Sequence, residues 1–403
     1  MRLFNELAVP GLGGVWFGKQ LFLATLGVLV AEQANERGCQ VTKIAVANAI
    51  EAIACWLALT GEPRTSGGRV LGSTKIIGHD SYSFSKVSQS NFYVTTPMRM
   101  TTVTALPALG LVETSGNRFN SFSCSRQGLE LVEAVCQDSR PFNKSVVEHL
   151  VQWVCGQDDR VDSGRLRAAL SPLTPLPPHA RLLIQARLHQ GTSREAESSR
   201  RRRSDALRWV ESRRQAAPPV GWDSRPVQIS NPEHWADLHA GALFFRVRNA
   251  ALDVLDELEI YIGTPERKYA FGASIPARVQ DALTSLNSVA QAFLDLNHHS
   301  VEARKFCSEC VSDSAVEVLS KLVGRDGRIL RLVGTNICPG PAFHGGEQPE
   351  EVQPESNDAP GAASHGWPDG ISHRISNLWW LSLDLDGEIE AWLNSENKEA
   401  THG

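Results

Sequence analysis

The segment 94–136 constrains the fold more than any other part of the chain, because it holds an ordered series of local signals. A Thr-rich stretch with apolar residues at helical spacing ends at Gly110, where the left-handed conformation of a helix stop costs glycine little. Leu111-Val112-Glu113 then starts a strand, and Ser115-Gly116-Asn117 predicts a hairpin turn into a return strand. Ser125-Arg-Gln-Gly128 precedes an amphipathic helix. The segment therefore predicts a compact unit of helix, hairpin and helix.

This order of parts resembles the recognition helix, wing and closing helix of the winged helix-turn-helix family, in the manner of MarR-like regulators. With preceding helices at 41–60 and around 83–92, the resemblance covers residues 41–136. It implies a helix that enters the major groove of double-stranded DNA and a wing that reaches phosphate or the minor groove. The side chains it places toward DNA are Arg99, Thr101, Thr102 and Thr104 on the helix and Arg118 and Arg126 at the wing and its exit. Pro107 departs from the family pattern, because proline inside a helix removes a hydrogen bond and shortens or kinks it.

A second basic feature is the run Arg200, Arg201, Arg202 and Arg203. The surrounding stretch, 193–214, holds eight arginines and four acidic residues. It can contact phosphates in a salt-dependent manner, or it can be a solvated helix face with i,i+4 pairs such as Glu197–Arg201. The net charge of the whole chain is −5, so a nucleic-acid role depends on such local patches.

Four residues form a candidate zinc site. They are Cys307, Cys310, Cys338 and His344, with His298 and His299 as substitute ligands. Thiolate and imidazole ligands suit tetrahedral zinc. The competing interpretation is that Cys307 and Cys310, three residues apart on a helix, are small buried hydrophobic residues.

Catalytic motifs are absent from the sequence: it has no G-x-S-x-G, no H-E-x-x-H and no D-x-D phosphatase signature. Residues 13–20 match G-x-x-x-x-G-K, but Gln20 stands where a P-loop needs a magnesium-binding Ser or Thr. Asp384 and Asp386 offer paired carboxylates without an identifiable third metal ligand. We therefore expect a non-catalytic protein and keep a metal-dependent enzyme as an alternative.

Cysteine usage and hydropathy bear on the compartment. The eight cysteines are sparse and several fall in apolar helical patterns, which is typical of a reduced, cytoplasmic protein. The most apolar N-terminal run, residues 20–31, is shorter than the roughly twenty residues of a membrane span, so it predicts a buried helix and no membrane partner.

The chain of 403 residues predicts a predominantly α fold with minor β (α+β) and three parts. They are a helical N-terminus with the winged-helix domain (1–150), a helical connector with the Arg-rich stretch (151–220) and a larger helical C-terminal domain (221–403) with an acidic loop at 345–369. The boundary near 216–221 follows the paired prolines there, which favour extended backbone. Helical periodicity predicts helices over 15–36, 41–60, 145–155 and 232–262.

Together these features predict a winged-helix protein that binds double-stranded DNA. It would act as a regulator or a non-catalytic subunit of a bacterial DNA-acting assembly, such as a defence or mobile-element system. Its other partners would be protein subunits or a second copy of the chain. The alternative from a different class is a protein–protein interaction scaffold that never meets DNA.

Overall fold

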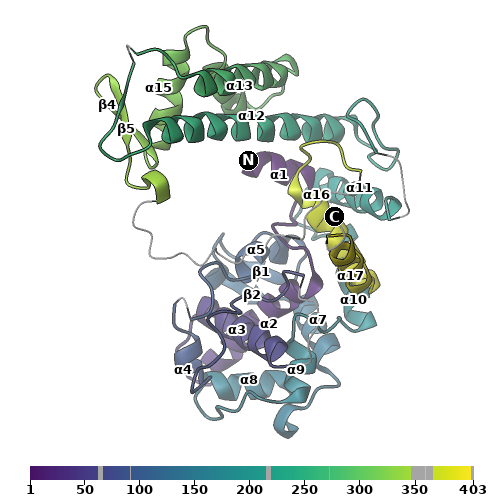
Figure 1. The fold of residues 1–403 in the computed structure, drawn as a ribbon. Helices are drawn as coiled ribbons and strands as arrows, with labels where there is room; N and C mark the ends of the chain where they lie inside the picture. The colour runs from purple at the N-terminus through teal and green to yellow at the C-terminus, as the bar shows by residue number, and fades with distance from the viewer. Residues whose placement is uncertain are drawn as a thin grey trace.

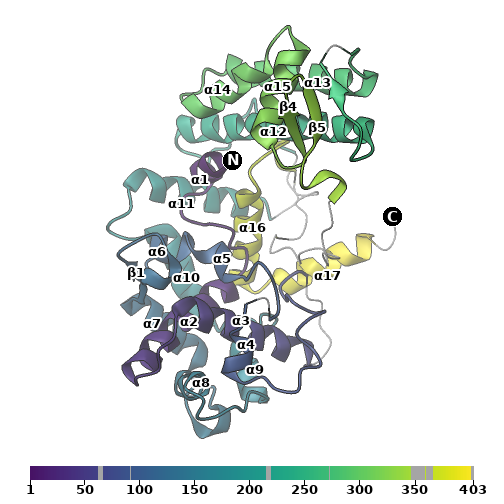
Figure 2. The same ribbon diagram turned by 90° about the vertical axis from the view of Figure 1, so that its left-hand side faces the viewer.

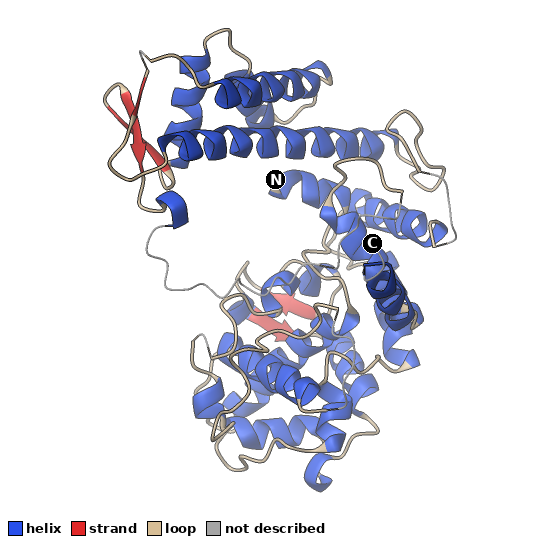
Figure 3. Ribbon diagram, in the orientation of Figure 1, coloured by secondary structure: helices blue, strands red, loops and turns tan. Residues whose placement is uncertain are grey.

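The computed structural model describes residues 1–61, 67–90, 92–214, 219–271, 273–345, 359 and 366–400. Helices dominate this part of the chain, and strands are confined to two small sheets (Figures 1 and 3). The prediction of a predominantly α fold with minor β is therefore confirmed.

Helix α2 (Gly18–Glu36) forms the centre of the larger core and packs against α3 (Lys43–Leu59). The apolar run at 20–31 is buried on all sides, as its composition predicts. Thr42 caps α3 by accepting a hydrogen bond from the amide of Ala45 at 3.2 Å. A Cβ on Gly27 would lie 2.6 Å from Cα of Ala47, so glycine is what allows the two helices to approach so closely.

The segment with the ordered signals folds into short elements. These are α4 (Phe84–Val87), α5 (Arg99–Thr102), α6 (Ala105–Ala108), β1 (Val112–Thr114), β2 (Phe122–Cys124) and α7 (Arg126–Cys136). Strands β1 and β2 form the predicted antiparallel hairpin, in which Glu113 pairs with Ser123. Gly110 has a φ of 72°, and Ser125 caps α7 by accepting from the amide of Gly128 at 3.0 Å.

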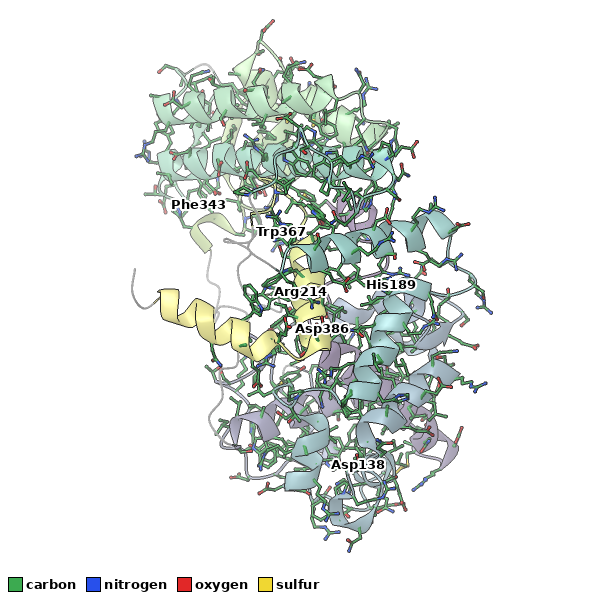
Figure 4. All side chains as sticks on the ribbon, turned by 90° about the vertical axis from the view of Figure 1, so that its right-hand side faces the viewer. Asp138, His189, Arg214, Phe343, Trp367 and Asp386 are labelled. Carbon is green, nitrogen blue, oxygen red and sulfur yellow. A yellow bond between two sulfur atoms is a disulfide. The ribbon has the colours of Figure 1, made fainter. Side chains whose placement is uncertain are left out.

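The remaining helices of the larger core come from the middle and the end of the chain. They are α8 (Val146–Val154), α9 (Gly164–Leu170), α10 (Pro178–Gln190), α11 (Glu197–Ser212), α16 (His373–Asp386) and α17 (Ile389–Ala400). Helix α16 packs against α11, α10 and α2, so the C-terminal region returns to the N-terminal half. Figure 4 shows Arg214, just beyond α11, beside Asp386 at the end of α16, and these two side chains form an ion pair.

A second core lies around the long helix α12 (Pro232–Ile262) (Figure 1). It also contains α13 (Ala277–Asp295), α14 (Val301–Cys310), α15 (Ala315–Asp326) and a three-stranded antiparallel sheet. The order in this sheet is β3 (Tyr269–Ala270), β5 (Asn336–Pro339), β4 (Leu330–Val333). The N-terminal helix α1 (Arg2–Ala8) lies along α12 and places Phe4 in this second core.

The two cores meet within helix α12. Apolar residues of 8–150 and of 151–220 share one core, together with α16 and with Trp235 and Leu238 at the start of α12. Within this helix, the residues of the second core start at Ala240. The physical reason is that α12 runs for 31 residues without a break and so belongs to both cores. Most of the predicted acidic loop at 345–369 lies outside the described residues.

Cys39 and Cys155 are joined by a disulfide with a Cα–Cα distance of 5.8 Å. The expectation of a fully reduced set of cysteines is therefore wrong for this pair. The packing of α2 against α8 brings together two residues that are 116 positions apart in sequence, which spacing alone did not reveal. In the described part of the chain no helix combines the length and the apolar character that crossing a bilayer requires.

Candidate nucleic-acid interface

The predicted recognition helix is packed into the fold instead of projecting from it. Thr102 is completely buried and its hydroxyl donates to the carbonyl of Arg99 at 2.8 Å, so its assignment as a DNA contact is wrong. Thr101 donates its hydroxyl to the carbonyl of Met98, and its own carbonyl accepts from the amide of Gly14 at 3.0 Å. Because Gly13 and Gly14 carry no side chains, the N-terminal segment can lie directly over this helix.

Residue Thr104 lies under the same segment, since a Cβ on Gly13 would come within 3.7 Å of the Thr104 Cβ. Pro107 lies in α6, and the predicted single helix is divided into α5 and α6, each of four residues. The structure therefore does not present the threonines as one continuous exposed face.

Arg99 points back toward α3. Its Nε donates to Oδ1 of Asn48 at 2.5 Å, and its guanidinium carbon lies 5.5 Å from the centre of the Phe119 ring. Burial lowers the pKa of Arg99, and the nearby Glu51 opposes that change. The side chain is thus held within the fold, and its predicted role at a base edge is not supported by this geometry.

Glu51 is the buried carboxylate behind Arg99. The hydroxyl of Tyr93 donates to its Oε2 at 2.8 Å. Burial raises the pKa of Glu51 to about 7, although the Tyr93 hydrogen bond and the charge of Arg99 act in the other direction. This cluster ties the start of α5 to the middle of α3.

The two predicted arginines of the hairpin remain accessible. Arg118 is exposed in the connection between β1 and β2. Arg126, at the start of α7, is 85 % exposed and donates to Glu130 at 3.0 Å. Exposed ion pairs of this kind contribute little to stability, so a phosphate can take the place of the carboxylate.

The arginine run at 200–203 separates into four different environments. Arg203 is fully buried and donates to both carboxylate oxygens of Glu195, at 2.5 and 2.7 Å. Arg202 pairs with Asp237 at 2.6 Å, and Arg201 pairs with Glu197 on the exposed face. Assigning Arg203 and Arg202 to nucleic acid is therefore wrong, because α11 turns both of them toward carboxylates inside the fold.

Arg200 lines a groove of about 680 Å³, which we call the arginine groove. One wall is the end of α6, strand β1 and the start of α7, and the other is the end of α10, the following turn and the start of α11. Figure 2 shows how these elements are arranged in the fold. The lining residues are Pro107, Gly110, Val112, Glu113, Thr114, Ser125, Gln127, Arg187, Gln190, Gly191, Thr192, Ser193, Arg194 and Arg200. The hairpin and the arginine run, predicted as two separate surfaces, thus meet in a single groove.

The three arginines of this groove form no ion pair among the described residues. Arg187 donates from Nε to the carbonyl of Leu109 at 2.7 Å, and Arg194 is exposed without a carboxylate partner in the described part of the chain. The Nε atom of Arg200 is buried and makes no hydrogen bond among the described residues. Glu113 is the one carboxylate among the lining residues. Burial and the charge of Arg203 lower the pKa of Arg187, and the charge of Glu195 opposes this change only in part, so an anion that enters the groove further stabilises the cation.

The sequence pattern did not indicate a binding role for two of these arginines. Arg187 lies in a polar helix without a recognisable cluster, and Arg194 was counted in the basic stretch without a separate role. They meet Arg200 because the chain reverses between α10 and α11 at Gly191, whose φ is 55°. The sequence signal for this cluster is the presence of basic residues on both sides of the turn at Gly191.

The candidate zinc set is not assembled. Cys307 and Cys310 are buried in the second core, and burial raises the pKa of both thiols to about 12, which disfavours the thiolate that zinc needs. Cys338 lies on β5, and His344 donates from its ring to the carbonyl of Gly263 at 3.0 Å. Among the described residues, the one group of three candidate metal ligands with its donor atoms within 4.8 Å is a different one.

That group is Asp237, His298 and His299. The amide of Ser300 donates to Nδ1 of His298 at 3.2 Å, so the ring proton is on Nε2, which donates to Oδ1 of Asp237 at 2.9 Å. A metal needs the lone pair that this proton occupies, and Arg202 already neutralises Asp237. The residues therefore fit a hydrogen-bonded link between α11, α12 and the connection from α13 to α14 better than a metal centre.

The P-loop-like stretch and the paired carboxylates belong to the same structural contact. The amide of Gly18 donates to Oδ2 of Asp384 at 2.7 Å, which places a carboxylate where a nucleotide phosphate would lie. Lys19 donates to the carbonyl of Ala169 at 2.5 Å, and burial lowers its pKa to about 8. Asp386 pairs with Arg214 and accepts from Gln185 at 2.8 Å. Gly18, Asp384 and Asp386 are thus used in packing α16 against the rest of the core, and Lys19 is used in a contact between α2 and α9.

No protein family, curated protein or solved structure matches the chain significantly.

Proposed function

We propose that this chain binds DNA through the arginine groove and the adjoining β1–β2 hairpin, as a regulator or a non-catalytic subunit of a bacterial DNA-acting assembly. The observation that supports this proposal is the convergence of Arg187, Arg194 and Arg200 in one groove, where none of the three forms an ion pair with a carboxylate of the described residues. Guanidinium groups donate two parallel hydrogen bonds to a phosphate, which makes such a groove suited to a phosphodiester backbone.

The winged-helix resemblance is compatible with this surface, with the β1–β2 hairpin in the place of the wing. Arg118 in the hairpin and Arg126 at the start of α7 are exposed, and Arg126 stands between Ser125 and Gln127, which line the groove. The helix expected to read bases contributes nothing to the proposed contact, since α5 lies beneath the Gly13–Gly14 segment. The proposal is therefore backbone recognition with little dependence on base sequence.

The test is fluorescence anisotropy of labelled DNA at several salt concentrations with three proteins: the wild type, Arg194→Ala with Arg200→Ala, and Arg201→Ala with Arg208→Ala. The last is the matched control, because it removes the same charge from exposed positions of α11 that lie outside the groove. Each phosphate contact contributes about −0.7 to −0.9 to the slope of log K against log salt concentration.

We expect the groove variant to lose affinity and to flatten this slope by about 1.5, which corresponds to two lost contacts. The control is expected to keep the wild-type slope. Equal loss in the two variants would show that general positive charge, and not the groove, carries the binding. A wild-type protein that fails to bind DNA at low salt would contradict the proposed function.

An interaction scaffold remains the second candidate function, and one observation favours it. A separate groove of about 630 Å³ lies between α2, α7 and α8, and its lining includes Leu29, Leu129, Val132 and Val147. Leu129 is 40 % exposed there. A scaffold is distinguished from a DNA-binding protein by the absence of salt-dependent DNA binding in the assay above.

A further inference from the structure

We infer that the arginine groove holds one strand of single-stranded DNA by its phosphates and does not admit a duplex; this inference rests on the proposed function. The groove has a volume of about 680 Å³, which is in the range of pockets that enclose a single small ligand. That space accommodates a short stretch of one strand, whereas two paired strands are too wide for it.

The approach of the two walls supports a single strand. A Cβ on Gly110 would lie 2.9 Å from Nη2 of Arg187 and 2.9 Å from Cγ2 of Thr192, so α10 and the following turn press against the end of α6. Arg187 lies at this narrow point, whereas Arg194 is exposed at the edge. A duplex can reach Arg194 from outside, but a phosphate at Arg187 must belong to a strand that enters the groove.

The covered helix gives independent support. Duplex recognition by a winged helix needs the recognition helix in the major groove. Here the amide of Gly14 donates to the carbonyl of Thr101, and Thr102 is buried, so that mode of docking is blocked. A strand held in the arginine groove needs no contact with α5.

The chemistry of the lining predicts how the strand is held. The lining residues include no aromatic side chain on which bases can stack, so the contacts are to phosphate and sugar. Arg187, Arg194 and Arg200 supply the cations, and Thr192 and Ser193 add hydroxyl groups beside them. The affinity should therefore depend little on base composition. The exception is a base whose amino group donates a hydrogen bond to the Glu113 carboxylate.

The experiment compares a single-stranded oligonucleotide of about 16 nucleotides with the duplex of the same sequence, in the full-length chain. It uses the wild type, Arg187→Gln and Arg187→Lys, with inorganic phosphate as a competitor. The Lys variant keeps the positive charge, and the urea midpoint of each variant checks that the hydrogen bond to Leu109 is not needed for folding.

We expect the single strand to bind about tenfold more tightly than the duplex, and Arg187→Gln to lower single-strand affinity about tenfold while duplex affinity changes less than twofold. Arg187→Lys should retain most of the single-strand affinity. Equal or tighter duplex binding, or an equal loss for both DNA forms, would overturn the inference and leave the proposed function intact. Displacement of the strand by inorganic phosphate, at a concentration equal to that of the phosphate groups in the oligonucleotide, would also overturn the inference. The groove would then hold only an isolated phosphate.

Discussion

Replacing Arg203 by Met is expected to destabilise the fold strongly, although this arginine belongs to the most basic run of the sequence. Its Nε donates to the carbonyl of Leu188 at 2.8 Å, and its Nη1 donates to the carbonyl of Pro10 at 3.0 Å. Both Nη atoms also donate to Glu195, whose side chain is 11 % exposed. Met keeps much of the apolar volume but leaves this carboxylate without its partner.

The magnitude follows from that geometry. Removing one partner of a buried ion pair costs about 3–5 kcal/mol, and the residual exposure of Glu195 favours the lower end of this range. With a urea m-value of about 3 kcal/mol per molar, the midpoint of unfolding should fall by about 1 M. Adding Glu195→Gln should recover part of the loss, because the unpaired charge is then removed.

The assay is urea unfolding followed by the fluorescence of the ten tryptophans, among them Trp209 in the same helix. Arg201→Met is the control, and it should change stability by less than about 0.5 kcal/mol because its ion pair with Glu197 is exposed. A stable Arg203→Met protein that loses DNA affinity would refute the reasoning, since Arg203 would then face solvent and not Glu195.

Three further predictions concern charge, pH and the disulfide. Glu113→Gln removes the carboxylate of the arginine groove and should tighten DNA binding about twofold at low salt, measured by anisotropy. Glu51 has a pKa raised to about 7 from the ordinary 4.5, so the folded chain holds this proton more tightly than the unfolded chain. The contribution of Glu51 to the free energy of unfolding is therefore highest at low pH and falls as the pH rises through 7. When urea midpoints are measured between about pH 5 and about pH 8, the midpoint of Glu51→Gln should decrease less with pH than that of the wild type. Without a reducing agent, Cys39→Ser should lower the free energy of unfolding by about 4–5 kcal/mol, because the Cys39–Cys155 disulfide closes a loop of 116 residues. A reducing agent should abolish the difference in stability between the wild type and this variant. An equal stability of the two proteins without reductant would contradict the disulfide.

Much of the helical framework can be predicted from local sequence signals. The expected helices at 15–36, 41–60 and 232–262 correspond to α2, α3 and α12, because each has an apolar pattern with a clear start or stop. The hairpin also follows from local chemistry, since Gly110 and the turn residues at 115–117 act over a few positions.

The burial of the predicted recognition helix depends on contacts that no local pattern encodes. Thr102, predicted to face DNA, is fully buried, whereas the apolar Met100 of the same helix is 52 % exposed. The helix is divided after Thr102, and the Gly13–Gly14 segment, nearly ninety positions earlier in the sequence, covers it. A polar residue is tolerated inside because its hydroxyl bonds within its own turn.

The candidate site illustrates the same limit. Glu113, Arg187 and Arg200 line one groove although they come from β1, α10 and α11. Charge counting found the basic stretch but not the partners that neutralise Arg202 and Arg203, because Asp237 and Glu195 approach them only in the folded chain. Sequence therefore indicated where positive charge is dense, and the fold decides which of it is free to bind an anion.

The most direct test of the DNA-binding surface is hydrogen–deuterium exchange of the chain with and without a single-stranded oligonucleotide. We predict that the bound strand slows amide exchange at 107–114 and 187–200, the two walls of the arginine groove, and leaves the exchange of α5 unchanged. Slower exchange confined to 99–104, or slower exchange at neither wall, would contradict it.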